Sequence, residues 1–392
     1  MKRVEDARPP VRENGAAGGQ AGSVSTGGQS WAASTLRSLI GRFGQGAWLD
    51  AFFMPAVVAA MCVYLSLTSD VFLTPGNIDN VLSQSVLLAI VAFGATFVIL
   101  AREIDLSVGA GVGLVSVIAS LVMVNTHSLG LGVLAGLGVG LTIGVVNGLL
   151  VTLLEVPSFI ATLGMLVILR GLSLALTNGG VIAGLPPGFD TMALGGFIGI
   201  KYIVWLTIGT FVVLYLVQTQ TSLGIQVYAV GGNPEAARLS GVRVKLVKFI
   251  CFLISGTTIA LGGLALTARV QSGQPNGGQL LELYSIAAIV MGGTSLFGGR
   301  GSVVRTVFGV LLIIVLQNGL DLLSVNFDVQ QAIIGTVFIA AASVDFVRRQ
   351  IERRSSRQAA RRAPPTSALD TLTRASDIDP QPAADSLKGG KT

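Results

Sequence analysis

The sequence predicts an all-α, polytopic integral membrane protein with about ten transmembrane helices and both termini on the cytoplasmic side. About half of its 392 residues are apolar and only 12% are charged, roughly half the charged share of an ordinary soluble domain. Most charges lie at the two ends of the chain and in one internal segment. The apolar stretches between them have the length that a helix needs to cross a bilayer, about 20 residues.

Composition divides the chain into three regions. Residues 1–50 and 348–392 are polar and rich in small residues, so we expect two disordered cytoplasmic tails, the second of them basic. The basic residues after the last span are explained by the positive-inside rule, and binding of anionic lipid is the alternative. Residues 51–347 form the predicted transmembrane domain, with one long cytoplasmic loop at 218–245. We expect no signal peptide before the first span, which would then begin this domain.

Ten apolar segments meet the length criterion, and the eighth of them is short. They are residues 51–69, 81–101, 106–124, 129–154, 159–177, 197–217, 246–266, 283–297, 303–323 and 329–347. An even number of spans places both tails on one side of the membrane. We expect the eighth segment to be broken or re-entrant because it is too short for a regular span.

The distribution of basic residues tests this number of spans. Cytoplasmic segments of membrane proteins carry an excess of Lys and Arg. With both tails inside, 23 of the 26 basic residues lie in inner segments. The remaining ones are Arg170, Lys201 and Arg269. The predicted outer loops carry acidic residues instead, namely Asp70, Asp79, Asp190, Glu282 and Asp328. A wrong number of spans would scatter basic residues over both sides, so the partition supports ten.

The fourth span carries glycines at every fourth position. They are Gly132, Gly136, Gly140, Gly144 and Gly148. This spacing lines one helix face without side chains, so that a second helix can approach closely. We interpret the face as a packing surface, with a substrate groove as the alternative. The same interpretation applies to Gly109, Gly111 and Gly113.

Residues for catalysis or metal binding are not found. His127 is the only histidine and lies in a predicted outer turn, which argues against a His-based metal site or a Ser-His-Asp triad. Cys62 and Cys251 fall inside apolar runs, as small buried hydrophobic residues do. We therefore expect no enzyme activity, metal or cofactor.

The long inner loop contains a short capped helix in the sequence NPEAARLSG. Asparagine caps orphan amides, proline suits the first helical position, and the acidic residue favours the positive helix end. Ser-Gly then ends the helix. It is a protrusion that fits another protein's cleft or, alternatively, an ordinary amphipathic loop helix. The segment consists of Asn233, Pro234, Glu235, Ala236, Ala237, Arg238, Leu239, Ser240 and Gly241.

Together with three other motifs, this loop resembles the membrane permease of ABC sugar importers of the ribose/xylose type. The other motifs are EIDLSVG at 103–109, VPSFIATLG at 156–164 and GGTSLFGGRGSV at 292–303. The resemblance covers roughly residues 50–347, with the motifs in the family's order. Arg102-Glu103 replaces the two glycines usual in the ribose branch. With TNG at 177–179 and NG at 318–319, this departure looks closer to the xylose branch.

The resemblance implies a transport subunit without catalytic activity of its own. Two permease copies would form the path for a monosaccharide, such as the pentoses xylose or ribose, across the inner or plasma membrane. Two ATPase subunits would dock on the cytoplasmic face, and an extracytoplasmic binding protein would deliver and mainly recognise the sugar. Residues 233–241 would be the coupling helix in the ATPase groove. Arg238, Arg243 and Lys245 would complement acidic positions on that partner.

Polar residues within or beside the spans are candidates for the substrate path or its inner gate. They are Glu103, Asp105, Ser107, Asn147, Asn318 and Asp321. For Asp105 and Ser107 a simpler interpretation is a tight turn at the membrane surface that caps the third span. Arg170, midway along the fifth span, needs an interior partner, for which Asp321 is one possibility.

Two other classes of protein compete with the ABC permease. A stand-alone, ion-coupled secondary sugar transporter normally has carboxylates near mid-membrane, whereas the acidic residues here cluster at the predicted span ends. An intramembrane enzyme needs a nucleophile and base or metal ligands, which the chain lacks. The ABC permease therefore remains the leading interpretation.

Overall fold

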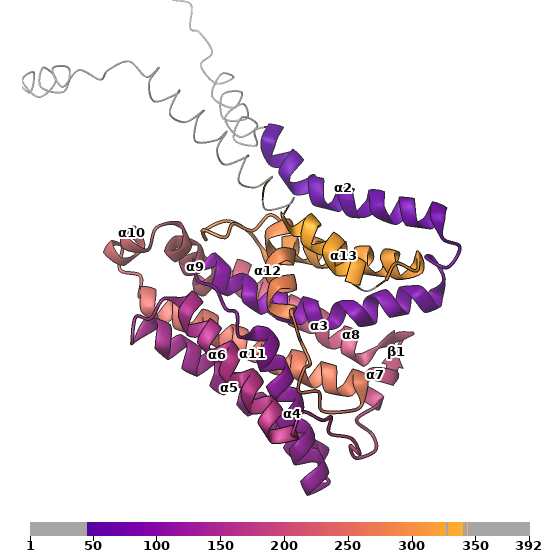
Figure 1. Ribbon diagram of the computed structural model, residues 1–392. Coiled ribbons are helices and arrows are strands. Elements are labelled where there is room, and N and C mark those ends of the chain that lie inside the picture. Colours follow the sequence, from indigo (N-terminus) through magenta and orange to yellow (C-terminus); the bar gives the residue numbers. More distant parts are fainter. Residues whose placement is uncertain (1–44, 327, 340–342, 344–392) are drawn as a thin grey trace, which may run out of the picture. The chain divides into compact units, whose positions relative to one another are not determined.

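The computed structural model describes residues 45–326, 328–339 and 343. Its contacts divide the chain into residues 1–52 and 53–392, and the helices of the second unit are described here (Figure 1). The two predicted disordered tails lie outside the described residues, except for residues 45–50. These residues are helical, which corrects the predicted end of the first tail at residue 50. Helix α2 (Gln45–Thr68) begins six residues before the expected start at Ala51.

Seven helices in the described part of the chain are long and apolar enough to cross a membrane. They are α3 (Pro75–Leu100), α4 (Val108–Thr126), α5 (Leu129–Thr152), α6 (Ser158–Thr177), α8 (Tyr202–Gln220), α11 (Val244–Val270) and α13 (Val303–Leu322). Three shorter apolar helices accompany them, namely Phe53–Thr68 within α2, α12 (Leu281–Met291) and Asp328–Ile339. Each of the ten predicted segments thus contains one apolar helix.

The smaller elements lie between these helices. A four-residue helix, α7 (Thr191–Leu194), precedes a hairpin of β1 (Gly196–Phe197) and β2 (Ile200–Lys201). This hairpin delays α8, which begins at Tyr202 and not at the predicted residue 197. The long inner loop folds into α9 (Ser222–Gly232) and α10 (Pro234–Leu239).

Helices α3, α4 and α11 form the centre of this unit. Of the residues in the most apolar stretch of each helix, 78% are buried in α3, 72% in α4 and 67% in α11. The share is 28% in α5 and 22% in α6. Helix α11 packs against α5, α3 and α4. The less buried helices present apolar side chains outward, as a lipid-facing surface requires.

The glycine face of α5 is a packing surface, as predicted. All five glycines are buried. A Cβ atom on Gly144 would lie 2.6 Å from the carbonyl oxygen of Phe252 and 3.0 Å from the Cα atom of Gly256, both on α11. A Cβ on Gly140 would meet the carbonyl oxygen of Gly256 at 2.6 Å. The backbones of α5 and α11 therefore touch directly, which only glycine permits.

The connection between α3 and α4 corrects the prediction that Asp105 and Ser107 lie in a tight turn at the membrane surface. Residues 103–107 have no regular secondary structure, and the segment enters the bundle. The side chain of Asp105 is only 4% exposed and Ser107 is fully buried. The sequence shows the charges of this segment but not the interhelical space that encloses them.

The eighth segment is broken, in line with its short apolar run. Helix α12 has only 11 residues, and residues 271–280 before it pack along α4. The amide of Gln274 donates to Ser116 Oγ at 3.1 Å. A Cβ on Gly113 would lie 2.9 Å from the carbonyl oxygen of Gly277. Glu282 was expected in an outer loop, but it is 8% exposed in the first turn of α12. Tertiary packing of the irregular segment buries it.

Candidate functional site

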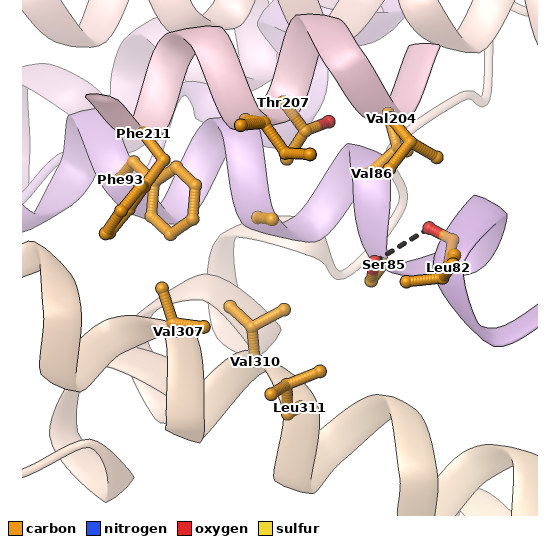
Figure 2. Close-up of a pocket in the computed structure, with 12 residues that line it drawn as sticks. Leu82, Ser85, Val86, Phe93, Val204, Thr207, Phe211, Val307, Val310 and Leu311 are labelled. Atoms are coloured by element: carbon orange, nitrogen blue, oxygen red, sulfur yellow. Dashed lines mark hydrogen bonds between the residues drawn. The ribbon is translucent and has the colours of Figure 1, made fainter. Parts of the chain in front are cut away.

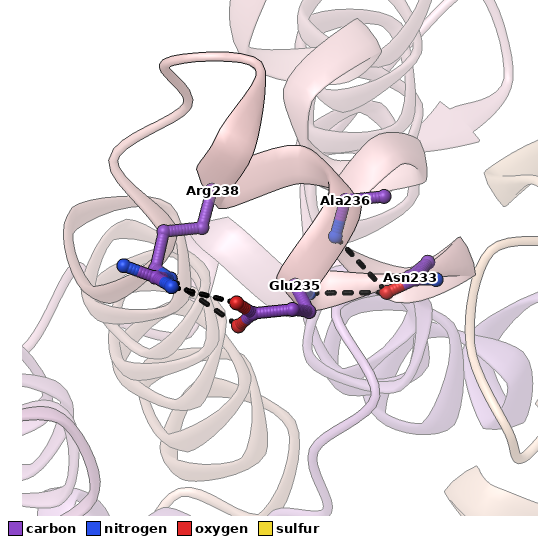
Figure 3. Close-up of polar contacts among 4 residues, drawn as sticks. All are labelled: Asn233, Glu235, Ala236 and Arg238. Atoms are coloured by element: carbon purple, nitrogen blue, oxygen red, sulfur yellow. Dashed lines mark hydrogen bonds and ion pairs between the residues drawn. The ribbon is translucent and has the colours of Figure 1, made fainter.

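Helix α10 has the capped geometry that its sequence predicts (Figure 3). The Asn233 side chain accepts hydrogen bonds from the amides of Glu235 and Ala236, both at 3.1 Å. Proline occupies the first turn. At the other end Gly241 takes φ +85°, and the amide of Val242 donates to the carbonyl of Ala237 at 3.0 Å. The start and the end of α10 are thus each capped by hydrogen bonds from neighbouring residues.

A salt bridge lies along the exposed side of α10. Arg238 Nη2 is 2.6 Å from Glu235 Oε1, and Arg238 Nε donates to Glu235 Oε2 at 3.2 Å. The hydrogen bond from Arg238 lowers the pKa of Glu235, and the same contact raises the pKa of Arg238. Leu239 beside them is 77% exposed. The helix therefore presents a fixed charge pair and an apolar side chain to its surroundings.

Helix α10 packs against α9 and α11, and α9 in turn contacts the end of α3 and the glycine-rich segment 292–302. Ala237 is buried, at 5% exposure. A Cβ on Gly231 would collide with the carbonyl oxygen of Leu100 at the end of α3, and the amide of Gly299 donates to that oxygen at 3.0 Å. Tyr228 donates to the carbonyl of Gly301 at 2.6 Å. Helix α9 therefore links α10 to the end of α3 and to the segment that precedes α13.

The four family motifs meet at this end of the bundle. The amide of Ile104, in the first motif, donates to Ser158 Oγ of the second at 3.2 Å. Thr162 Oγ1 donates to the carbonyl of Ile104 at 3.3 Å. The glycine-rich motif joins the end of α3 through Gly299. Residues spread over 200 positions therefore form one connected region.

Two salt bridges fix the start of α11 in the same region. Lys248 Nζ lies 2.5 Å from Glu103 Oε1, and Lys245 Nζ lies 2.5 Å from Glu155 Oε1. The hydrogen bond from Lys245 lowers the pKa of Glu155. Lys245 and Arg238 were expected to face acidic groups of a partner, yet each already has an acidic partner within the chain.

Asp105 lies at the centre of a buried polar cluster that joins four parts of the bundle. Its carboxylate accepts from the Ser107 amide at 3.0 Å, from Ser107 Oγ at 2.6 Å and from Ser255 Oγ of α11 at 2.8 Å. Asn147 Nδ2 of α5 donates to Ser107 Oγ at 2.8 Å. Asp105 thus binds an amide at the start of α4, but Ser107 makes no cap hydrogen bond. The prediction of a serine cap was wrong because its hydroxyl bonds to Asp105.

The other path candidates lie apart from this cluster. Asn318 exchanges two hydrogen bonds with Asn77 of α3, at 2.8 and 3.0 Å. Asp321 accepts from Gln330 at 2.8 Å. Pairing of Arg170 with Asp321 is not found, and two nitrogens of Arg170 are buried without a hydrogen bond. Sequence analysis missed Asn77 because it precedes the apolar run used to define the second span.

Apolar cavities lie between helices in the described part of the chain. One of about 260 Å³ lies among α3, α8 and α13 (Figure 2), and one of about 470 Å³ lies among α4, α5 and α6. The hydroxyls of Ser85 and Thr207 in the first bond to their own helix backbone. These cavities therefore offer few groups to a sugar. The described residues also contain no group of three or more His, Cys, Asp or Glu side chains placed to hold a metal.

Comparison with known proteins shows the family. Residues 77–342 match the family described as "Branched-chain amino acid transport system / permease component". The chain is 41% identical over 287 residues to the ribose import permease protein RbsC of Bacillus subtilis (strain 168), covering 73% of this chain and 89% of the relative. The chain belongs to the permease family of ABC sugar importers.

Two further relatives extend this result. The ribose import permease of Escherichia coli (strain K12) is 38% identical over 309 residues, covering 78% of this chain and 96% of the relative. The xylose transport system permease XylH of the same strain is 33% identical over 360 residues, covering 76% and 92%. No solved structure matches. The sequence identity is higher to these ribose permeases than to the xylose permease, which does not support the prediction that the chain resembles the xylose branch more closely.

Membership in the family settles the class of protein. The chain is a multi-pass permease of the inner or plasma membrane, and in these transporters the ATPase is a separate subunit. The prediction of a non-enzymatic transport subunit is confirmed.

Proposed function

We propose that this permease forms the translocation path for a pentose and is driven by a separate ATPase subunit. Its relatives include proteins named for the transport of ribose, D-allose, L-arabinose and xylose. The identities make ribose the first sugar to test, followed by xylose. Two permease copies and an extracytoplasmic sugar-binding protein complete the proposed importer.

The proposed membrane topology has ten spans with both termini in the cytoplasm. The end of the bundle that carries α10 would be the cytoplasmic end. The segregation of basic residues supports this orientation. The β1–β2 hairpin, between the fifth and sixth spans, would face the binding protein.

The observation that carries the proposal is the exposed, capped helix α10, which packs on α9 and α11. Residues 233–241 would be the coupling helix that enters a groove of the ATPase. Leu239 would supply an apolar contact, and the Glu235–Arg238 pair would orient the helix electrostatically. Because α11 begins five residues after α10 ends, movement of α10 would reach the bundle through α11.

The Asp105 cluster is the proposed inner gate. Ser255 of α11 holds Asp105, and Asp105 holds Ser107, which also binds Asn147 of α5. A shift of α11 would therefore rearrange this cluster, with Glu103 following through Lys248. Asn318 and Asp321 make contacts elsewhere and are not included in the gate.

Reconstitution tests the energy source. Proteoliposomes that contain the permease, its ATPase and its binding protein should accumulate radiolabelled ribose or xylose only with ATP inside the compartment that holds the ATPase. The second candidate, an ion-coupled carrier, is kept because Asp105 and Glu282 are carboxylates buried in the bundle. Uptake by the permease alone, driven by an ion gradient, would establish that candidate and refute ours.

Charge exchange on α10 tests the coupling helix. The single variants Glu235→Arg and Arg238→Glu break the salt bridge and place like charges together, so sugar transported per ATP should fall. The double variant E235R/R238E restores an internal pair with reversed polarity. If the sugar transported per ATP stays low in the double variant, the loss arises from the contact with the partner and not from the broken internal salt bridge. Wild-type coupling in both single variants would remove the assignment of α10.

A further inference from the structure

The irregular segment 271–280 lies at the middle of the membrane domain. The amide of Gln274 donates to Ser116 Oγ, and a Cβ on Gly113 would lie 2.9 Å from the carbonyl oxygen of Gly277. Both contacts are made near the middle of α4, which is long enough to cross a bilayer. Non-helical backbone at this depth occurs only where protein encloses it or where it lines a water-filled cavity.

One side of this segment is packed and the other is exposed. Pro275 is buried, and a Cβ on Gly277 would collide with the side chain of Leu266 on α11. The segment therefore rests on α4 and α11, two of the central helices. Asn276 and Gln279 are exposed instead, and their side chains make no hydrogen bond within the described part of the chain. The amide of Gln279 donates to the carbonyl of Asn276 at 3.3 Å, so a turn holds the two residues close together.

Unbonded amide groups at this depth are not suited to face lipid. Thr142 on α5 is exposed as well, but its hydroxyl donates to the carbonyl of Gly138 at 2.7 Å and is satisfied within its own helix. The amides of Asn276 and Gln279 have no such partner. Polar groups inside a membrane face the bundle interior or a water-filled cavity. In the proposed importer the path lies between two permease copies, so a surface exposed on one copy at this depth can line that path.

We propose that Asn276 and Gln279 line the translocation path and form hydrogen bonds with the hydroxyl groups of the sugar at the middle of the membrane. An amide side chain both donates and accepts hydrogen bonds, as a sugar hydroxyl does. Neither amide carries a charge, which suits a neutral monosaccharide. Broken helices form substrate sites in transporters, and this segment breaks the eighth span. The inference rests on the proposed function of sugar import.

Thiol labelling tests whether the two residues face water. Asn276→Cys, Gln279→Cys and the control Thr142→Cys are made in a Cys62→Ala background, in which the remaining Cys251 is 1% exposed. Nanodiscs hold the whole importer, nucleotide-free or with ATP, and a charged methanethiosulfonate reagent reaches both membrane faces but not the lipid. Because the thiolate that reacts forms only in water, positions 276 and 279 should be modified about tenfold or more faster than position 142. Modification as slow as at position 142 in both states would overturn the proposal, because the residues would then face lipid or the second copy.

Removal of the amides tests the contact with sugar. The side chains are exposed and unbonded, so the double variant N276L/Q279M should assemble normally with the ATPase. At saturating sugar-loaded binding protein, its ribose uptake should fall about tenfold, as the loss of two hydrogen bonds predicts. ATP hydrolysis should stay within about twofold of wild type, and Thr142→Val should import normally.

Selectivity gives a readout that a purely structural role would not move. With the same binding protein, the wild-type complex should import ribose faster than 2-deoxyribose or 3-deoxyribose, and N276L/Q279M should reduce that preference. Wild-type uptake and preference in the double variant would overturn the contact with sugar. A wild-type complex that imports no sugar with ATP would instead overturn the proposed function, while thiol labelling would still decide whether the segment faces a water-filled path.

Discussion

The direct backbone contact between α5 and α11 predicts that Gly144→Ala destabilises the bundle. The added Cβ would lie 2.6 Å from the Phe252 carbonyl oxygen and 3.0 Å from the Gly256 Cα atom, whereas ordinary contact begins at 3.4 Å. The obstructing atoms are backbone and cannot rotate away. The helices must therefore separate by about 0.4 to 0.8 Å locally, as these distances require.

The expected cost follows from this separation. A gap of about 0.5 to 1 Å forfeits a quarter to a half of the dispersion energy of each atom pair, which is ~0.1–0.2 kcal/mol at contact. Overpacked interiors lose about 1–3 kcal/mol in total. We expect a loss in that range for Gly144→Ala.

A second glycine of α5 is the matched control. Gly138 has nothing within 4 Å of its Cβ position, so Gly138→Ala should leave stability unchanged or raise it slightly through helix propensity. Thermal unfolding in detergent can be followed with a thiol-reactive dye, because Cys251 on α11 is 1% exposed in the folded protein. Equal unfolding temperatures for the two alanine variants would refute the direct backbone contact.

Three further predictions concern side chains that join the helices. Asn318→Leu should destabilise the bundle by about 1–2 kcal/mol, because the buried Oδ1 atom of Asn77 loses the hydrogen bond from Asn318. In the double variant N77L/N318L, equilibrium unfolding should show most of that loss recovered; additive losses would contradict the pairing. Lys248→Met should lower the free energy of unfolding more than Lys245→Met, because the Lys248 side chain is 22% exposed and the Lys245 side chain 63%. Exposed salt bridges contribute about 0–1 kcal/mol. The reverse order of the two losses would contradict the difference in burial. Lys245→Met should return the pKa of Glu155 to its ordinary range, measurable by carboxyl NMR. The pKa of Glu155 is lower in the folded than in the unfolded protein, so the Lys245–Glu155 pair stabilises the fold at pH values above the unfolded-state pKa. This stabilisation is lost as the pH falls through the folded-state pKa.

Features set by local sequence were predictable. Hydrophobic length located the seven long apolar helices in the described part of the chain, because each needs about the same run of apolar residues. The four-residue glycine repeat identified the packing face of α5. The cap residues of α10 act on amides two and three positions away, so its ends could be read from Asn233 and Gly241.

Features set by contacts between distant segments were not predictable. Asp105 and Glu282 were placed at surfaces because charged residues beside apolar runs usually reach water. Each is buried by a segment far away in sequence, Ser255 of α11 for Asp105 and the start of α4 for Glu282. Asn77 could not be recognised from the sequence as a single polar residue, because its structural role is to pair with Asn318 on α13.

The central claim is that α10 receives the work of ATP hydrolysis from a partner subunit. A photo-reactive phenylalanine analogue at Leu239 tests it most directly, with Ile198 in the β1–β2 turn as the control, since both side chains are 77% exposed. In membranes that contain the whole importer, illumination should join the Leu239 variant to the ATPase and leave the Ile198 variant unjoined to it. An ATPase adduct from Ile198 and none from Leu239 would contradict the claim.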